Sequence, residues 1–144
     1  MIAKFEGQYF FLSNFFECPV TYKGITFTNT EAAFHSQKDI NRAKEFAHLD
    51  PSSAKKLGRK VNLRSDWEQV KDDIMYEVLV AKFTQNAALK ILLLRTGDQE
   101  LIEGNWWNDT YWGVCRGVGK NTLGKLLMRL RQEIREGKYG STAN

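Results

Sequence analysis

The sequence contains no long hydrophobic run and few cysteines or histidines. Its longest aliphatic run, residues 91–94, is far shorter than the roughly 20 residues that a membrane-spanning helix needs. Residues 1–5 show no basic segment leading into an apolar one, so we expect no signal peptide, no membrane partner and a cytoplasmic location. The two cysteines and two histidines form no C-x-x-C or H-x-x-x-H pattern. We therefore expect reduced cysteines, no metal site and no cofactor.

The chain also lacks a large excess of either positive or negative charge. The chain has 21 Lys and Arg against 17 Asp and Glu, a formal net charge of +4. This small excess suits an anionic ligand such as a phosphate, and it falls short of the basic face of a dedicated nucleic-acid-binding protein. With 144 residues and no repeat or linker, the chain fits one domain, residues 1–137, followed by a flexible tail, 138–144.

Turn and helix signals predict an α+β fold, a predominantly α-helical single domain with a small N-terminal β element. Residues 20–22 and 25–27 flank Lys23-Gly24 and predict a hairpin. Asn29 or Thr30 is expected to cap the first helix, and a capping box at Ser65–Glu68 is expected to open the longest one. The expected helices are 31–40, 51–58, 67 onward, 86–97 and 121–136, with a short strand at 101–103.

The helix expected at 31–40 carries the first candidate site. Spacings of three, four and seven residues place Glu31, His35 and Lys38 on one helical face, beside Phe34. One interpretation is a solvated polar stripe. The other is a carboxyl group and an amine that face one pocket, where the acid protonates a departing base and the lysine forms a Schiff base with a sugar aldehyde.

A polar loop at 105–113 carries the second candidate site. It contains four aromatic residues: Trp106, Trp107, Tyr111 and Trp112. One interpretation is that rings such as Trp106 and Trp107 cover the edge of the core. The other is that Tyr111 or Trp112 stacks on a base or ribose, which contributes about 1–3 kcal/mol, while Asp109 supplies a second carboxylate.

Residues 117–121 precede the last expected helix and resemble a nucleotide-binding loop only loosely. A P-loop requires Gly at position 114 and Ser or Thr at position 121, where this chain has Val114 and Asn121. Exposed amides at the helix start, together with Lys120, could still bind a phosphate. The alternative is a flexible loop in which Asn121 is an ordinary N-cap.

Trp67 begins an apolar stripe on the longest expected helix. The stripe continues through Val70, Ile74, Val78 and Ala81. This pattern favours a core position for Trp67, although the first turn of a helix would also allow it to form a pocket wall.

Taken together, these segments resemble the NADAR family, also called YbiA-like. The resemblance covers residues 11 to about 131 and rests on motifs in the family's order. They are Phe11–Phe15, Pro19, Gly24, Thr30–Glu31, Phe34–Lys38, Trp67–Lys71, Asn108–Gly113, Gly119–Met128 and Arg131. The chain departs from the family pattern at Ala32-Ala33, at His35, where Gln is frequent, and at Val114-Cys115. These departures bear on substrate choice, because the acid–lysine pair is intact.

The resemblance implies an N-glycosidase that cuts the bond between ribose C1′ and a base or amine. It implies Glu31 as acid/base, Lys38 as the imine-forming nucleophile and Asp109 as a second acid. The residues expected to bind substrate are Asn14, Phe15, Trp67, Tyr111, Trp112, Gly113, Lys120 and Asn121.

The implied partners are phosphorylated ribosides of the riboflavin pathway or small molecules that contain ADP-ribose, such as ADP-ribosylated guanine. ADP-ribosylated nucleic acid is a further candidate. Two other functions stay open from the sequence: a non-catalytic module that binds ADP-ribose or a nucleotide, and a small basic nucleic-acid-binding protein.

Overall fold

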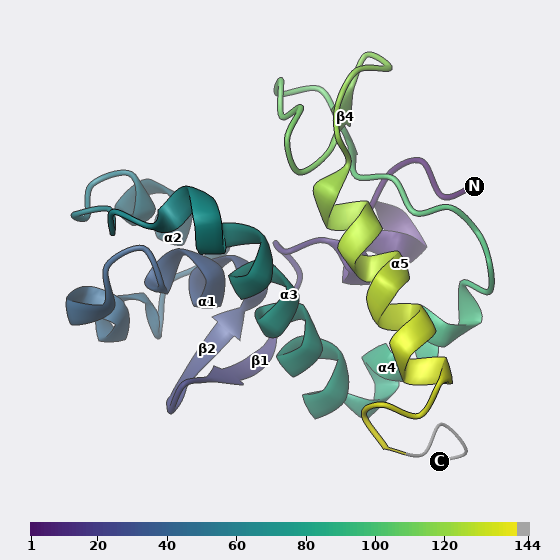
Figure 1. Ribbon diagram of the computed structural model, residues 1–144, viewed down its shortest axis with the longest axis horizontal. Coiled ribbons are helices and arrows are strands. Elements are labelled where there is room, and N and C mark those ends of the chain that lie inside the picture. The colour runs from purple at the N-terminus through teal and green to yellow at the C-terminus, as the bar shows by residue number, and fades with distance from the viewer. Residues whose placement is uncertain (141–144) are drawn as a thin grey trace. The chain divides into compact units, whose positions relative to one another are not determined.

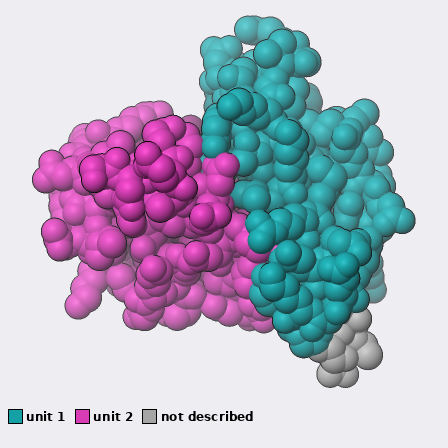
Figure 2. Space-filling view, in the orientation of Figure 1, with its two compact units in different colours: residues 1–13, 88–144 teal, residues 14–87 magenta. Residues whose placement is uncertain are grey.

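The computed structural model describes residues 1–140, which form two compact units. Unit 1 contains residues 1–13 and the chain from residue 88 onward, and unit 2 contains residues 14–87 (Figure 2). Helices dominate both units and the strands are short (Figure 1), which confirms the expected α+β class. Residues 141–144 of the expected tail lie outside the described residues, and the domain boundary at residue 137 stays a prediction.

Unit 2 begins with a β-hairpin. Strand β1 (Glu17–Tyr22) pairs antiparallel with β2 (Ile25–Asn29), with Tyr22 opposite Ile25. The two turn residues, Lys23 and Gly24, have φ values of 50° and 81°. Two positive φ angles are the requirement of the type I′ turn, whose twist matches that of the paired strands. The predicted hairpin is therefore confirmed.

Helix α1 (Thr30–Ser36) follows β2 directly. The side chain of Asn29 accepts a hydrogen bond of 2.8 Å from the amide of Ala32, which confirms the predicted cap. The helix ends at Ser36, whose hydroxyl donates to the carbonyl of Ala33 at 2.6 Å. A hydroxyl that bonds back to the preceding turn competes with the helical pattern. The predicted helix to residue 40 is therefore wrong, and Lys38 lies in the turn after α1.

The rest of unit 2 packs around α1. The 3₁₀ helix η2 (Ile40–Phe46), α2 (Pro51–Gly58), α3 (Trp67–Gln85) and both strands all contact α1 (Figure 1). Asp50 caps α2 as predicted, accepting from the amide of Ser53 at 2.7 Å. The predicted capping box before α3 is wrong. Asp66 occupies the N-cap position, and its carboxylate is paired with Arg64 at 2.6 Å.

One lysine of α3, Lys82, is fully buried in unit 2. Its ammonium group lies 5.7 Å from the ring centroid of Phe16 and 5.1 Å from that of Phe83. Burial lowers the pKa of Lys82 from its usual value near 10.5 to about 8, and nearby Cys18 opposes the shift. The protonated form of Lys82 is therefore less stable in the folded protein than in the unfolded chain.

We expect Lys82→Met to stabilise the protein at pH 7, raising the free energy of unfolding by about 1–3 kcal/mol. Below pH 8 the lysine is protonated in both states and the folded state bears the whole cost. As the pH rises from 8 towards 10.5 this cost disappears, so the gain from the substitution should shrink. Urea unfolding at several pH values measures this, with the exposed Lys125→Met as the control. A gain that does not vary with pH would contradict the assignment.

Unit 1 contains η1 (Gly7–Leu12), α4 (Ala87–Arg95, apart from its first residue), β3 (Gly104–Asn105), β4 (Val114–Cys115) and α5 (Thr122–Arg135). The strand predicted at 101–103 is wrong: Leu101 only bridges to Ile2, and β3 instead pairs in parallel with β4. The side chain of Asn86 bonds to carbonyls of Pro19 and Lys82, so it closes α3, and α4 begins at the next residue.

The apolar stripe predicted for the last helix faces the core of unit 1. Leu123, Leu127, Leu130 and Ile134 are buried, and Leu126 is half-buried. Within residues 1–140, every helix is either too short or too polar to cross a bilayer.

Candidate active site

Unit 2 gathers an acid, an imidazole, an amine and two aromatic rings around α1. We call Glu31, Phe34, His35, Lys38 and Trp67 the acid–lysine cluster. The ring of Phe34 lies 5.1 Å from that of Trp67 and 5.2 Å from that of His35, measured between centroids. Trp67 is buried, so it belongs to the core and, through this cluster, also lies next to the candidate catalytic groups.

Glu31 is held in a buried position at the first turn of α1. Its side chain is 11% exposed, and its amide donates to the backbone carbonyl of Asn14 at 3.2 Å. A carboxylate in the first turn is stabilised by the helix dipole. Its ion-pair partner is His35, whose Nε2 lies 3.4 Å from Oε2 of Glu31. Glu31 is thus a rigidly placed acid with little access to bulk water.

Lys38 lies close to Glu31 although the two residues do not share a helix. Burial lowers the pKa of Lys38, and the charges of Arg59 and Lys55 lower it further, while the charge of Glu31 raises it. The ammonium group lies 5.6 Å from the ring centroid of Trp67. A lysine whose pKa is lowered supplies more free amine near neutral pH, and the free amine is the nucleophilic form.

Three buried polar atoms near α1 have no hydrogen-bond partner within residues 1–140. They are Oδ1 of Asn14, Oγ1 of Thr30 and Nδ1 of His35. The amide nitrogen of Asn14 makes a weak contact of 3.5 Å with the sulfur of Met75. An unsatisfied buried polar atom costs about 1–3 kcal/mol, so such atoms persist mainly where function uses them. The predicted substrate-binding residue Asn14 therefore lies beside Glu31 with acceptor capacity to spare.

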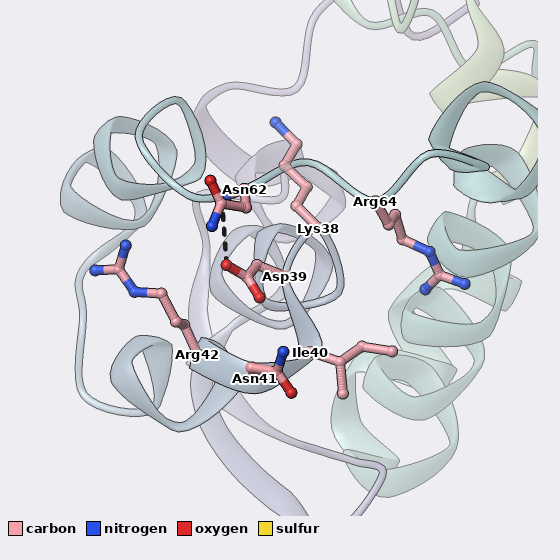
Figure 3. Close-up of a pocket in the computed structure, with 7 residues that line it drawn as sticks. All are labelled: Lys38, Asp39, Ile40, Asn41, Arg42, Asn62 and Arg64. Carbon is pink, nitrogen blue, oxygen red and sulfur yellow. Dashed lines mark hydrogen bonds between the residues drawn. The ribbon is translucent and has the colours of Figure 1, made fainter.

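A recess next to Lys38 lies on the same unit (Figure 3). Its lining residues are Lys38, Asp39, Ile40, Asn41, Arg42, Asn62 and Arg64. Asp39 accepts from the amide of Asn62 at 3.2 Å. Figure 3 shows the amine of Lys38 directed away from Asp39, and the guanidinium groups of Arg42 and Arg64 directed apart. The three cations thus do not converge on one anion. Of the recess residues, only Lys38 was predicted from the sequence as a site residue.

In unit 1, Asp109 organises its own loop. Its Oδ1 accepts from the amides of Tyr111 at 3.1 Å and Trp112 at 2.9 Å. The side chain of Asn105 bonds to both the amide and the carbonyl of Asp109, and also to Glu103 Oε2 at 3.0 Å. An aspartate that bonds two residues onward forms an Asx turn. At least one oxygen of the predicted second acid is therefore committed to loop structure.

At the start of α5, the amides that were expected to bind a phosphate are bonded to the loop, so phosphate binding by Lys120 stays a prediction. Carbonyls of the loop accept the amides around the helix start in four hydrogen bonds of 2.8–3.3 Å: Lys120 to Thr110, Asn121 to Gly113, Thr122 to Tyr111 and Leu123 to Trp112. Lys120 is exposed, and its amine lies 5.3 Å from the ring centroid of Tyr111.

Asn121 is not the side-chain N-cap that the sequence predicts. It has a left-handed conformation with φ 55°, and no cap hydrogen bond is made by its side chain. Instead the amide donates to the carbonyl of Leu101 and accepts from the amide of Glu103, both at 2.9 Å. Asn121 thus joins the loop at residues 101–103 to the start of α5.

Gly113 allows two backbone segments of unit 1 to touch. A Cβ atom at this position would collide with the carbonyl and the carboxylate of Glu103. Glu103 and Asn105 are not predicted by any spacing in the sequence, because their role depends on this close approach of two segments.

Trp106 and Trp107 of the aromatic loop do not cover the core. Trp106 is 77% exposed and Trp107 is 45% exposed, and they pack edge to face on each other at 5.7 Å. Tyr111 and Trp112 are half-buried and form a second such pair at 4.9 Å. In unit 2, Phe15 is half-buried next to Asn14 in the chain.

The structure thus divides the predicted site residues between the units. Unit 2 contains Asn14, Phe15, Glu31, Lys38 and Trp67, and unit 1 contains Asp109, Tyr111, Trp112, Gly113, Lys120 and Asn121. Within residues 1–140, no three His, Cys, Asp or Glu side chains are grouped closely enough to hold a metal ion.

Comparison with known proteins gives a consistent result. The family model described as "NADAR domain" matches residues 3–135. N-glycosidase YbiA of Escherichia coli K12 is 41% identical over 128 residues, which cover 85% of this chain and 79% of that protein. A riboflavin biosynthesis protein of Vibrio vulnificus is 35% identical over 132 residues, or 88% of this chain and 36% of that protein.

The fold also matches a solved structure. The NMR structure of E. coli YbiA has a TM-score of 0.84 to this chain at 35% sequence identity, and the match covers 100% of this chain and 92% of that one.

Proposed function

The chain belongs to the NADAR domain family, and on that premise we propose that it is an N-glycosidase. The bond cut is that between ribose C1′ and a base or amine of a phosphorylated riboside. The observation that carries this proposal is the buried Glu31 carboxyl beside a lysine whose pKa is lowered by burial. Relatives of this chain are named N-glycosidase and riboflavin biosynthesis protein, which supports the same reaction class.

The proposed mechanism uses Glu31 as the acid and Lys38 as the nucleophile. Glu31 gives a proton to the departing base as the bond between C1′ and the base nitrogen breaks. The free amine of Lys38 bonds to C1′, and one of its two protons returns to the Glu31 carboxylate. The C1′–O4′ bond then breaks and the ring opens, and the second amine proton passes to O4′, which leaves an imine between Lys38 and C1′. Water then adds to C1′ and displaces Lys38, which releases the sugar and restores the amine.

We assign the acid/base role to Glu31 alone. Asp109 has an oxygen committed to the amides of Tyr111 and Trp112, so its first role is to shape the aromatic loop. Contacts of Tyr111, Trp112 and Lys120 with substrate stay predictions.

Two substrate classes fit this chemistry: ribosylamino-pyrimidine phosphates of the riboflavin pathway, and ADP-ribose conjugates such as ADP-ribosylated guanine, free or in nucleic acid. A mass-spectrometric screen of both classes, with NAD derivatives included, should detect liberated base from one of them. Tight binding of ADP-ribose without release of base from any compound would instead indicate a non-catalytic binding module.

We expect Arg59→Ala to shift activity to higher pH. Arg59 is exposed at the C-cap of α2, and its charge is one of the causes that lower the pKa of Lys38. Removing this charge raises the pKa of Lys38, so a higher pH is needed for the same fraction of free amine. The acidic limb of the pH profile of kcat/KM should therefore shift to higher pH. Arg129→Ala, an exposed position on α5, is the control, and identical profiles for the two variants would refute the assignment.

A further inference from the structure

His35 lies between the proposed acid and the backbone of α2. Its Nε2 is 3.4 Å from Oε2 of Glu31, and both residues are 8% exposed. The imidazole also packs edge to face on Phe34. The mechanism above assigns no role to this buried, titratable side chain.

The other nitrogen of the ring indicates which proton the imidazole carries. Nδ1 is buried and has no hydrogen-bond partner in the part of the chain that the structure describes. A proton on Nδ1 would therefore be a buried donor without an acceptor, which costs about 1–3 kcal/mol. Nε2, by contrast, lies 3.4 Å from Oε2 of Glu31, so a proton on Nε2 has a carboxyl oxygen nearby. The geometry thus favours Nε2 over Nδ1 as the protonated nitrogen.

The charged groups around the ring come from α1, from the turn that follows it and from α2. Lys38 follows His35 by three residues, and α2, against which the ring packs, carries Lys55 and Arg59. Glu31 is the acidic group in contact with the ring.

Gly58 fixes the position of the ring. A Cβ atom at this position would lie 2.6 Å from Nδ1 of His35 and 3.0 Å from Cγ. Real Cβ contacts are essentially never below 3.0 Å, so any side chain at residue 58 would push the imidazole away. The last residue of α2 is thus glycine for packing, since its backbone is helical.

We infer that His35 is a positioning residue for Glu31: Nε2 of the imidazole lies against Oε2 of the Glu31 carboxyl group and fixes its position, and Gly58 holds the ring in place. This inference rests on the proposed function of Glu31. It assigns His35 no contact with substrate, so its loss should lower kcat and leave KM unchanged.

Two substitutions at position 35 separate positioning from packing. His35→Met fills the space without a donor, and we expect it to lower kcat roughly 10- to 100-fold. His35→Gln keeps an N–H donor, and we expect kcat within about threefold of wild type. Thermal unfolding of both variants controls for stability. Equal activity of the two variants, or an effect confined to KM, would overturn the inference.

A double-mutant cycle tests the role of Gly58. Gly58→Ala should lower kcat when His35 is present, and it should have little further effect in the flexible His35→Met background. Ser52→Ala, at an exposed position of α2, is the control and should be additive. Additive effects of Gly58→Ala and His35→Met would show that the two residues act independently.

An NMR measurement keeps this test separate from the proposed activity. The ¹⁵N resonances of His35 should report the Nε2–H tautomer in the wild type, and Glu31→Gln should shift the Nε2 resonance. Both results are expected even if no riboside is hydrolysed, in which case the proposed function fails and the pairing stands. An Nδ1–H tautomer would overturn the pairing itself.

Discussion

Replacing Glu31 by Gln is expected to lower kcat by roughly 10²–10⁴-fold, the usual loss when an acid/base group is removed. The amide has nearly the shape of the carboxyl, so it keeps the contact with the helix start but has no proton to give a departing base. Because Glu31 is buried at the first turn of α1, no water replaces it easily. Substrates with a better leaving group need less protonation and should lose less activity.

The matched control is Glu45→Gln, the same change on an exposed residue of η2 that is paired with Arg42 at 2.8 Å. It should leave kcat unchanged. Circular dichroism and thermal unfolding should show both variants folded. If Glu31→Gln keeps full activity on the substrate that the wild type hydrolyses, another group supplies the proton and the assignment of Glu31 is wrong.

Replacing Lys38 by Met should abolish formation of a covalent sugar adduct and lower turnover by roughly 10³-fold or more, as expected for loss of a nucleophile. Borohydride reduces an imine to a stable amine, so treating the wild-type enzyme during turnover should add the mass of the reduced sugar to Lys38. The burial that lowers the pKa of Lys38 increases the fraction of free amine at a given pH and so favours this reaction.

The control for this experiment is Lys44→Met, at an exposed position of η2. This variant should form the borohydride-reduced sugar adduct and should turn over substrate as the wild type does. A Lys38→Met variant with normal turnover would show that water attacks C1′ directly. That result would be compatible with the proposed N-glycosidase activity but would contradict the imine intermediate.

Local signals in the sequence predicted several elements correctly. The hairpin turn at Lys23-Gly24, the Asn29 cap and the Asp50-Pro51 start of α2 all depend on residues within a few positions of one another. The core stripe of α5 follows from its helical period. These features could be read from sequence because each is decided by backbone preferences and hydrogen bonds inside one short segment.

The site was predicted less completely, for a physical reason. The sequence paired Glu31 with Lys38 through a helix that in fact ends at Ser36, so the correct pair was found by an incorrect geometry. Turn residues 37–38 bring the lysine back to the acid, and its pKa is lowered by burial and by Arg59 and Lys55. Burial is a property of packing, which no spacing along one helix contains.

The sequence by itself determined the family, the fold class and the chemical groups that are present: a carboxyl, an amine and an aromatic loop. Only the tertiary structure decided which of those groups are available. Loop carbonyls cover the start of α5, Asp109 spends an oxygen on its own turn, and Gly58 admits the ring of His35 beside Glu31. Each of these outcomes depends on which atoms come within hydrogen-bonding or van der Waals distance of one another. Those distances are set by how the chain packs, and the spacing of residues along one helix does not contain them.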